Sequence, residues 1–554
     1  MTLTTLPDSL RNTWAKRPET TPLGLSLVTA IFVFAVHNAT FWRIGSDVFD
    51  GHGLSFAGFI AAVFCLAIAV QSVFSFPYVV KPFLAFVLIL GAVTSYYMDR
   101  LGVIIDRDMI QNVMVTTITE SKHLITLGFV THVVLTGILP ALALLFVRIK
   151  RQGLLRTIAT PVLSLVLMLA LTAGFLMADL KSYAAVFRER KDLMSSFQPF
   201  APMVGAIRYV RMVSGTAHVE VQPIGGDAHR GPSYGAGRKP MLTIVVAGET
   251  ARSQNFGLNG YVRDTTPMLA QRDVISFDNV SSCGTATAVS LPCMFSMFTR
   301  EDYSYEKAVS HQNVLDVLGH AGLHVAWWDN NTGDKGLANR LESRSFTNVE
   351  DAEFCAAGEC MDGIFMQALK DYAETITEDT VLVLHQIGSH GPTYYLRYPE
   401  AFERFKPACR TAEFKECSTA EITNAYDNTI AYTDDILAHT IDLLAAESNL
   451  TTALLYVSDH GESLGESGLY LHGSPYFMAP AYQTTVPMVL WMSEGFKAQF
   501  GLDETCVSQQ AGNALSHDNL FHSLLGMLDI STDVRDPALD IFAACRTGLK
   551  VAQK

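Results

Sequence analysis

The longest apolar stretches of the chain all lie within its first 180 residues, and they constrain the fold more than any other feature. A membrane-spanning helix needs roughly 20 consecutive apolar residues. Five stretches reach that length: 22–42, 54–75, 77–97, 125–147 and 157–178. Residues 1–180 are therefore predicted to form a multi-pass α-helical membrane domain with five spans.

The rest of the 554-residue chain has the mixed composition of a globular protein. Residues 181–240 begin with aromatic and basic residues and end in a Gly- and Pro-rich stretch, which is typical of interfacial helices followed by a linker. Residues 241–554 are predicted to form a second domain outside the membrane. The net charge of −14 argues against a nucleic-acid partner, and we expect a monomer.

Basic residues in the short loops set the orientation of the predicted spans. Arg11, Lys16 and Arg17 precede the first apolar stretch, and a basic cluster lies between the fourth and the fifth. Because Lys and Arg concentrate in cytoplasmic loops, the N-terminus is predicted in the cytoplasm and residues 241–554 on the opposite side of the membrane. The first stretch is longer than the apolar core of a signal peptide, and we interpret it as an uncleaved anchor.

Cysteine spacing indicates an oxidising compartment for the second domain. Six of the nine cysteines form close pairs: Cys283 with Cys293, Cys355 with Cys360, and Cys409 with Cys417. The sequence lacks the repeated CxxC pattern of a structural zinc cluster, so we predict three disulfides. Cys506 and Cys545 form a more distant pair, and their spacing leaves a fourth bridge open.

Short apolar runs alternate with helical segments from Met241 onward. The runs are 241–250, 324–330, 380–390, 452–462 and 486–493. Continuous Val, Ile and Leu strands separated by helices are typical of a parallel sheet covered on both faces. The predicted fold of this domain is an α/β sandwich with a mostly parallel sheet.

Four of these five runs end in polar residues able to bind a metal or a phosphate. They are Glu249 with Thr250, Asp329 with Asn330, His385 with His390, and Asp459 with His460. Ligands bind beyond the carboxyl ends of the strands in open α/β sheets. Carboxylates together with imidazole suit zinc better than magnesium or calcium, so we predict Glu249, Asp459 and His460 as zinc ligands. A turn at Gly461 that Asp459 and His460 merely organise is the alternative.

A hydroxyl nucleophile is predicted in the small-residue segment 281–293, because three protein ligands leave the fourth position of a catalytic zinc open. We favour Thr285. At the start of a helix its oxygen would lie near the positive end of the dipole, and zinc would lower the pKa of its hydroxyl. Thr287 and Ser290 are the local alternatives, and Thr285 could also act only as a helix cap.

Phosphoryl transfer needs positive charge around the phosphate oxygens. Lys335, His390 and His472 lie in Gly-containing loops with room for a phosphate and are predicted to supply that charge. His390 is also a candidate ligand of a second zinc ion. A solvated or structural role is the alternative for each of the three.

The loop between the third and fourth predicted spans contains Asn112, Thr116 and Glu120. Their spacing of four residues would place them on one face of a helix. A solvated helix surface and a binding face are both compatible with this pattern.

Four motifs make the chain resemble the lipid A phosphoethanolamine transferases, the family that includes the mobile colistin resistance enzymes. They are GETARSQNFGLNGY at 248–261, SCGTATAVSLPCMFS at 282–296, GSHGPTY at 388–394 and SDHGESLGE at 458–466. The resemblance extends over nearly the whole chain, including the five apolar stretches. It implies a multi-pass protein of the bacterial inner membrane with an alkaline-phosphatase- or sulfatase-like catalytic domain in the periplasm.

The resemblance also implies roles for individual residues. Zinc would be bound through Glu249, Thr285, Asp459 and His460, and Thr285 would carry phosphoethanolamine covalently. Donor or second-metal binding would involve Lys335, His390 and His472, and substrate binding would involve Asn112, Thr116 and Glu120. The Cys355–Cys360 loop is tighter than the family pattern implies.

The reaction that the resemblance implies is transfer of phosphoethanolamine from phosphatidylethanolamine to a lipid A phosphate, which would confer resistance to cationic peptides such as polymyxin and colistin. Transfer to a core sugar of lipopolysaccharide and transfer of phosphoglycerol remain open. A sulfatase is disfavoured, because the segment 281–293 lacks a CxPxR-like motif. Outside the enzymes, the alternative is a membrane sensor that only binds a lipid or a peptide; such a protein would not need zinc ligands that face a threonine.

Overall fold

The computed structural model describes residues 17–216, 219–347, 349–356 and 358–546. Contacts between Cα atoms divide the chain into two compact units. The first contains Met1–Arg107 and Ile125–Ile207, and the second contains Asp108–Leu124 and Arg208–Lys554. The domain limits predicted at residues 180 and 240 remain predictions.

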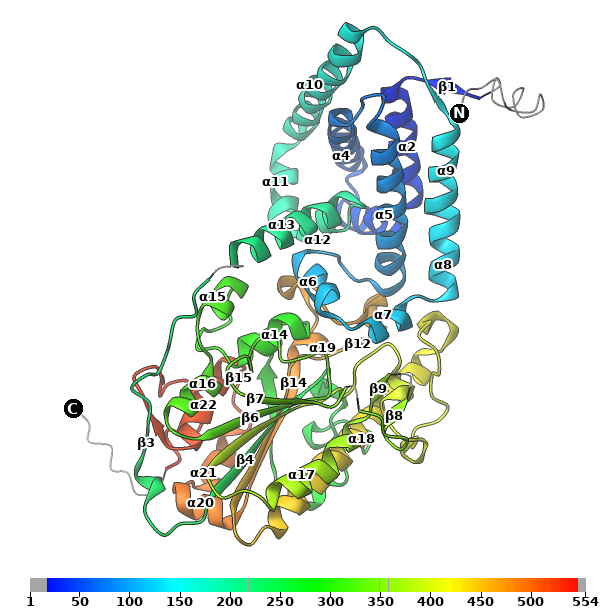
Figure 1. Cartoon of the computed structure of the whole chain (residues 1–554). Helices are drawn as coiled ribbons and strands as arrows, with labels where there is room; N and C mark the ends of the chain where they lie inside the picture. The colour runs from blue at the N-terminus through cyan, green and yellow to red at the C-terminus, as the bar shows by residue number, and fades with distance from the viewer. Residues whose placement is uncertain (1–16, 217–218, 348, 357, 547–554) are drawn as a thin grey trace. The chain divides into compact units, whose positions relative to one another are not determined.

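Long apolar helices make up most of the first unit (Figure 1). Four segments are long and apolar enough to cross a membrane: α4 Gly53–Val73, α5 Val80–Leu101, Leu127–Phe146 and α10 Leu154–Ala178. Leu127–Phe146 consists of α8 Leu127–Val133, the π-helical segment η2 Val134–Ile138 and α9 Leu139–Phe146. A fifth span results if a bent pair of helices counts as one. The predicted multi-pass helical membrane domain is confirmed.

The first predicted span, 22–42, is not one straight helix. Instead, α2 Pro22–Val36 and α3 Ala39–Val48 meet with a bend of 70°. Asn38 lies at the break, where its Nδ2 donates to Val33 O at 3.0 Å and its Oδ1 accepts from the backbone N–H of residue 198 at 2.8 Å. The amide side chain therefore replaces hydrogen bonds that the helix loses where it ends.

The segment after the last candidate span is helical, in the first part of the stretch 181–240 for which the sequence predicts helices. It forms α11 Leu180–Glu189, α12 Lys191–Ser195 and α13 Phe200–Thr216. The boundary between the two units falls within α13.

An eight-stranded sheet forms the centre of the second unit. Its strand order is β15 Leu515–Ser516, β5 Ile275–Ser281, β14 Thr485–Met492, β11 Thr451–Ser458, β4 Met241–Gly248, β10 Thr380–His385, β6 His324–Asp329 and β7 Glu342–Ser345. Strand β14 runs antiparallel to both of its neighbours, whereas the other pairs in the described sheet are parallel. The predicted α/β fold with a mostly parallel sheet is confirmed.

All five predicted strands are present, as β4, β6, β10, β11 and β14. Strands β4 and β11 are buried at every position, as expected for central strands covered on both faces. The sequence analysis missed β5, β7 and β15. Strand β5 mixes buried and exposed positions and β7 is exposed throughout, so neither contains the continuous apolar run that marks a central strand.

Helices cover both faces of this sheet (Figure 1). Val245 of β4 packs in one core with residues of α16 Val314–His320 and α22 Asp518–Met527. On the opposite face, Thr452 of β11 donates to a carbonyl of the long helix α18 Thr419–Ala446 at 3.0 Å. The sheet is thus the middle layer of a sandwich, and its strand ends are left to form a site.

Shorter elements complete the description of the chain. Further helices are α6 Arg107–Val115, α7 Ile118–Leu124, α14 Thr287–Met294, α15 Tyr305–Ser310, α17 Phe365–Ala373, α19 Ala481–Thr484, α20 Glu494–Phe500 and α21 Glu504–Gln510. Two-residue strands pair as β1 Glu19–Thr20 with β2 Arg148–Ile149, β3 His229–Arg230 with β16 Ile530–Ser531, β8 Cys355–Ala356 with β9 Glu359–Cys360, and β12 Ser463–Leu464 with β13 Tyr470–Leu471.

The three predicted disulfides are present in the second unit, and a fourth joins the pair that spacing left open. The bridges are Cys283–Cys293, Cys355–Cys360, Cys409–Cys417 and Cys506–Cys545. The Cys283–Cys293 bridge encloses the start of α14, and therefore constrains the segment in which the sequence predicts a nucleophile.

The register of the central strands brings their carboxyl ends to one edge. Ser458 of β11 pairs with Gly248 of β4, and His385 of β10 pairs with Asp329 of β6. Residues that directly follow these strands are therefore neighbours in space although they are far apart in the sequence.

Candidate active site

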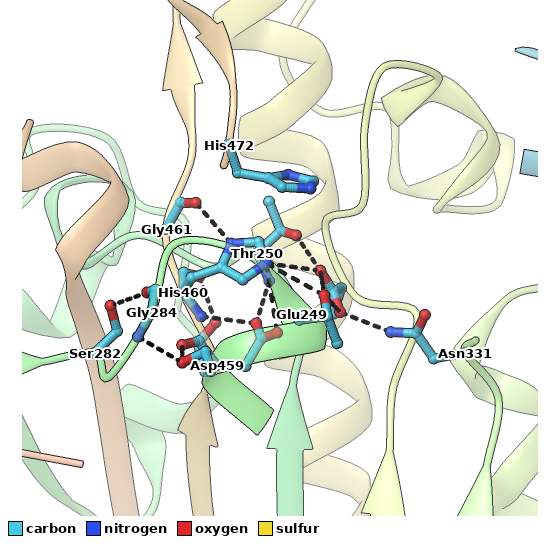
Figure 2. A network of polar contacts seen from close by, with 12 residues as sticks. Glu249, Thr250, Ser282, Gly284, Asn331, Asp459, His460, Gly461 and His472 are labelled. Atoms are coloured by element: carbon cyan, nitrogen blue, oxygen red, sulfur yellow. Dashed lines mark hydrogen bonds and ion pairs between the residues drawn. The ribbon is translucent and has the colours of Figure 1, made fainter. Parts of the chain in front are cut away.

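Glu249, Asp459 and His460 meet where β4 and β11 end (Figure 2). One potential ligand atom from each side chain lies within 4.8 Å of the other two. The Nε2 atom of His460 is 3.4 Å from Oε1 of Glu249 and 3.4 Å from Oδ2 of Asp459. All three side chains are buried. The residues predicted as metal ligands therefore form one buried group.

This donor set fits a zinc ion, for which carboxylate and imidazole are common ligands. Oδ2 of Asp459 is buried and has no hydrogen-bond partner among the described residues. Burial and the nearby charge of Glu249 raise the pKa of Asp459 well above its ordinary value. Two carboxylates this close need a positive charge between them to be ionised together, and a metal ion would supply it.

His460 is suited to bind a metal through Nε2. Burial, together with the charge of His472, lowers the pKa of His460 to about 4, so its ring is neutral at physiological pH. Its Nδ1 atom lies 3.0 Å from Gly461 O, which favours the tautomer with the proton on Nδ1 (Figure 2). The lone pair of Nε2 then faces Glu249 and Asp459.

Thr287 is a hydroxyl residue that faces this group. It is the first residue of α14, and its Oγ1 atom lies 3.0 Å from Oε2 of Glu249 and 3.3 Å from Nε2 of His460. The first N–H groups of a helix have no partner within the helix, and together with the helix dipole they favour a negatively charged oxygen at this end. Thr287 therefore occupies the position that the sequence analysis assigned to Thr285.

Thr285 itself makes a different set of contacts. Its Oγ1 donates to Ser474 O at 2.6 Å, and its carbonyl accepts from Gly473 N at 2.7 Å. The prediction that Thr285 joins the metal ligands is corrected by this geometry. Its physical reason is the start of the helix: α14 begins at Thr287 after Ala286 as N-cap, so Thr285 still belongs to the preceding loop.

Two residues hold this loop near the end of β11: Ser290, which the sequence analysis gave as an alternative nucleophile, and His517, which it did not assign to a site. Gly284 N donates to Ser290 Oγ at 3.2 Å, and Ser290 Oγ donates to Asp459 O. His517 accepts from Cys283 N at 3.1 Å, and its Nε2 lies 3.0 Å from the last carbonyl of β11. Both contacts fix the distance between the start of α14 and Asp459.

Asn331 and Thr250 hold the carboxylate of Glu249 from two sides (Figure 2). Asn331 Nδ2 donates to Glu249 Oε2 at 2.7 Å, and the Thr250 hydroxyl donates to Oε1. The sequence analysis placed Asp329 and Asn330 at this strand end but overlooked Asn331. Its position two residues beyond β6 was the available signal.

His472 and His390 lie beside the group formed by Glu249, Asp459 and His460, and their donor-binding role stays a prediction. The ring centroids of His472 and His460 are 4.5 Å apart, and those of His472 and His390 are 5.6 Å apart. Burial by itself would lower the pKa of His472, but the hydrogen bond and the charge of Glu462 raise it to about 9. His472 is therefore positively charged at neutral pH and suited to contact a phosphate oxygen.

Lys335 lies four residues beyond Asn331 and lines a cavity of about 90 Å³ together with Pro292 and Ser296. Its Nζ atom donates to Thr332 O at 2.6 Å. The donor-binding role of Lys335 therefore stays a prediction.

The loop residues Asn112, Thr116 and Glu120 do not share one continuous helix. Helix α6 ends at Val115 and α7 begins at Ile118, and the Thr116 hydroxyl donates back to Asn112 O at 2.7 Å. The side chain of Glu120 lies outside the described part of the chain. The spacing of four residues is thus interrupted, and the substrate-binding role of the three stays a prediction.

Asp329 and His385 pair with each other next to the metal group. Oδ1 of Asp329 and Nδ1 of His385 are 2.7 Å apart, and both side chains are buried. Burial raises the pKa of Asp329, but the hydrogen bond and the charge of His385 bring it below its ordinary value. The two predicted strand-end residues thus contact each other.

Two family profiles match the chain in different parts. The Sulfatase family matches residues 242–530, which contain the sheet apart from Met241, and the family described as Phosphoethanolamine transferase EptA/EptB matches residues 63–213.

Proteins that match over nearly the full length agree with these results. Phosphoethanolamine transferase EptA of Escherichia coli (strain K12) is 38% identical over 96% of this chain and 98% of its own. Phosphatidylethanolamine transferase Mcr-1 of Escherichia coli is 36% identical over 94% and 97%. The structure of the integral membrane protein lipooligosaccharide phosphoethanolamine transferase A of Neisseria meningitidis superposes with a TM-score of 0.92 at 35% identity, covering 96% and 99%. The chain therefore belongs to the EptA family of phosphoethanolamine transferases, to which Mcr-1 and Mcr-2 are related.

Proposed function

We propose that the protein transfers phosphoethanolamine from phosphatidylethanolamine to a phosphate group of lipid A through a covalent adduct on Thr287. The observation that carries this proposal is the contact of the Thr287 hydroxyl with Glu249 and His460, at 3.0 and 3.3 Å. Membership of the family supports phosphoethanolamine as the group that is transferred. The donor is supported by the name of Mcr-1 as a phosphatidylethanolamine transferase, and the acceptor class by that of the lipooligosaccharide enzyme.

Glu249, Asp459 and His460 would hold a zinc ion next to the Thr287 oxygen, and His390 is a candidate ligand of a second one. When bound, zinc supplies positive charge that lowers the pKa of the Thr287 hydroxyl and offsets the negative charge of the phosphate. Asn331 and Thr250 would keep the Glu249 carboxylate in its orientation.

In the first step, the Thr287 oxygen attacks the phosphorus of phosphatidylethanolamine. The bond between Oγ1 and phosphorus forms while the bond from phosphorus to the diacylglycerol oxygen breaks. The hydroxyl proton of Thr287 passes toward the Glu249 carboxylate, to which it already donates. Diacylglycerol takes up a proton as it leaves, and phosphoethanolamine stays on Thr287.

In the second step, an oxygen of a lipid A phosphate attacks the same phosphorus. The bond to the Thr287 oxygen breaks, and Thr287 regains from Glu249 the proton that passed there in the first step. His472, which is charged at neutral pH, and His390 would contact the equatorial phosphate oxygens in both steps. The start of α14 favours the negative charge that returns to the Thr287 oxygen.

The product explains the physiological effect that we propose. Each transfer adds an ammonium group next to a lipid A phosphate, which weakens the attraction of cationic peptides such as polymyxin and colistin. We place the catalytic unit in the periplasm and the spans in the inner membrane, because four disulfides suit an oxidising compartment.

The decisive experiment is mass spectrometry of lipid A from a Gram-negative host that expresses the wild type, Thr287→Ala or Thr285→Ala. We expect a phosphoethanolamine adduct with the wild type and with Thr285→Ala but none with Thr287→Ala. A wild type without any adduct on lipid A would contradict the acceptor, and analysis of the core oligosaccharide would then follow. In parallel, labelled phosphatidylethanolamine and phosphatidylglycerol offered to the purified protein distinguish the two donors.

A further inference from the structure

A chain of contacts among three side chains connects helix α7 to the loop that contains His390. His123 Nε2 of α7 lies 3.3 Å from Oε2 of Glu359. The same carboxylate oxygen accepts from Arg397 Nη1 at 2.7 Å, and Arg397 Nε donates to His390 O at 2.9 Å. All four residues belong to the second unit.

The centre of this chain is buried. The Arg397 side chain is 1% exposed and that of Glu359 is 10% exposed. Burial would raise the pKa of Glu359, but the charge and hydrogen bond of Arg397 bring it below its ordinary value, so both groups are charged. A buried ion pair contributes little net stability compared with apolar residues of the same size. Net stability therefore does not by itself account for the Arg397–Glu359 pair, and we look for another role.

A short disulfide-bonded hairpin supports the Glu359 end. Glu359 is the first residue of β9, which pairs with β8, and the Cys355–Cys360 bridge closes the hairpin. The disulfide and the strand pairing therefore restrict the backbone that carries the Glu359 carboxylate. The Arg397 end is equally constrained, because its guanidinium contacts the backbone of His390 rather than a mobile side chain.

The segment 108–124 touches two further parts of the proposed site. Gln111 Nε2 donates to Ala288 O at 3.3 Å, directly after Thr287 in α14. A side chain at Gly473 would meet the terminal methyl group of Met109 at 2.2 Å, so this methionine packs against the residue after His472. In the sequence, the segment lies between two candidate membrane spans, α5 and α8.

We infer that Arg397 is a positioning residue that fixes the backbone of His390, and that Glu359 couples this position to the docking of α7 through His123. The inference rests on the proposed function, in which His390 contacts the phosphate. Seating of the segment 108–124, which connects two candidate spans, would then be a condition for full activity of the catalytic unit. Arg397 and Glu359 act through His390 and do not touch the substrate.

Kinetics of the full-length chain in detergent, with fluorescent phosphatidylethanolamine as donor, test the positioning role. Arg397→Lys keeps a positive charge beside Glu359 but lacks the planar fork that reaches His390 O. We expect its kcat to fall roughly 10- to 100-fold, while KM and the melting temperature stay close to those of the wild type. Arg410→Lys is the matched control, because the Arg410 side chain is 55% exposed in its ion pair with Glu403, and it should be unchanged.

A kcat of Arg397→Lys equal to that of the wild type would overturn the positioning role, as would a loss that merely follows a lower melting temperature. The variant Arg397→Met with Glu359→Met removes both charges and so keeps the fold testable if a single variant is unstable. It should also show the low kcat, because it cannot hold the His390 carbonyl.

Hydrogen exchange tests the coupling to α7 without any use of transferase activity. We expect Glu359→Gln to speed amide exchange in residues 118–124 and in the His390 loop, and the His123→Gln variant to do the same. Unchanged exchange in both regions would overturn the coupling. If the wild type transfers no phosphoethanolamine, the proposed function fails while this readout still decides whether the chain of contacts operates.

Discussion

The Oγ1 atom of Thr287 lies 3.0 Å from Oε2 of Glu249, whereas the hydroxyl of Thr285, only two residues earlier, donates to Ser474 O. The start of α14 separates the two threonines: one belongs to the helix and faces the metal group, and the other belongs to the loop. Both have the same chemistry, so their positions alone assign different roles.

Substitution of these two threonines should therefore have unequal effects. Thr287→Ala should lower kcat by at least about 10³-fold, because no nucleophile remains. Thr285→Val should keep activity within about tenfold and cost about 1–3 kcal/mol in stability, since Ser474 O loses a donor. Initial rates of transfer and melting curves of the purified chain check both values. A stronger loss in Thr285→Val than in Thr287→Ala would reverse our assignment.

Removal of a ligand should empty the metal site. We expect Glu249→Gln to lose most of the zinc that the wild type retains after dialysis, because the neutral amide is a poor zinc ligand. Elemental analysis of the purified chain measures this, and the exposed Glu400→Gln serves as control. Treatment of the wild type with a chelator should abolish transfer, and added zinc should restore it. Full activity in a zinc-free sample would contradict the proposal.

Asn331 should act through the Glu249 carboxylate. It donates to Oε2 at 2.7 Å, so Asn331→Ala frees one side of a metal ligand. Loss of such an outer contact typically costs roughly 10- to 100-fold in metal affinity or activity. Titration with zinc in a competing chelator checks the affinity, and the exposed Asn513→Ala provides the comparison. An unchanged affinity together with unchanged kcat would show that Glu249 keeps its orientation by itself.

Asp434 should make stability fall as the pH rises from about 4 to about 6. Burial raises its pKa to about 6, although the backbone N–H groups of Met268 and Leu269 donate to it. Because the folded-state pKa exceeds the unfolded value of 3.8, the folded state binds the proton more tightly in this interval. The contribution is fully present below pH 3.8 and is lost as the pH passes the folded value.

The measurement compares melting temperatures of the wild type and Asp434→Asn between pH 4 and pH 7.5. As the pH rises over this range, the free energy of unfolding of the wild type should fall relative to that of the variant by up to about 3 kcal/mol. Two pKa units correspond to about that energy. A difference that does not depend on pH would mean that Asp434 titrates normally in the folded state.

The Cys506–Cys545 bridge should stabilise the chain without taking part in the reaction. It closes the longest of the four disulfide loops, with a sequence separation of 39. Loop-closure entropy for that length corresponds to roughly 4 kcal/mol, and measured effects are often smaller. Cys506→Ser with Cys545→Ser should lower the free energy of unfolding by about 2–4 kcal/mol and leave kcat unchanged at a temperature where the chain stays folded. A changed kcat there would assign the bridge to the active site.

The sequence alone determined the elements that depend on local composition. Runs such as 241–250 and 452–462 begin with mostly apolar residues, so they predict central strands, and the polar residues at their ends predict a site at one edge of the sheet. Glu249, Asp459 and His460 could be predicted in this way, because they follow the ends of buried strands. The close cysteine pairs were accessible for the same reason, since short spacing restricts the possible bridges.

Tertiary structure decided the features that depend on a boundary or on a distant partner. Because α14 begins at Thr287, this residue and not Thr285 faces the predicted metal ligands. The break at Asn38 bends the first predicted span. Asn331 reaches Glu249 from a different strand, a contact that no local pattern contains. Strand β5 joins the sheet through pairing rather than through composition. Local propensity indicates which elements form, but hydrogen bonds between segments far apart in the sequence determine where each begins and which side chain faces the site.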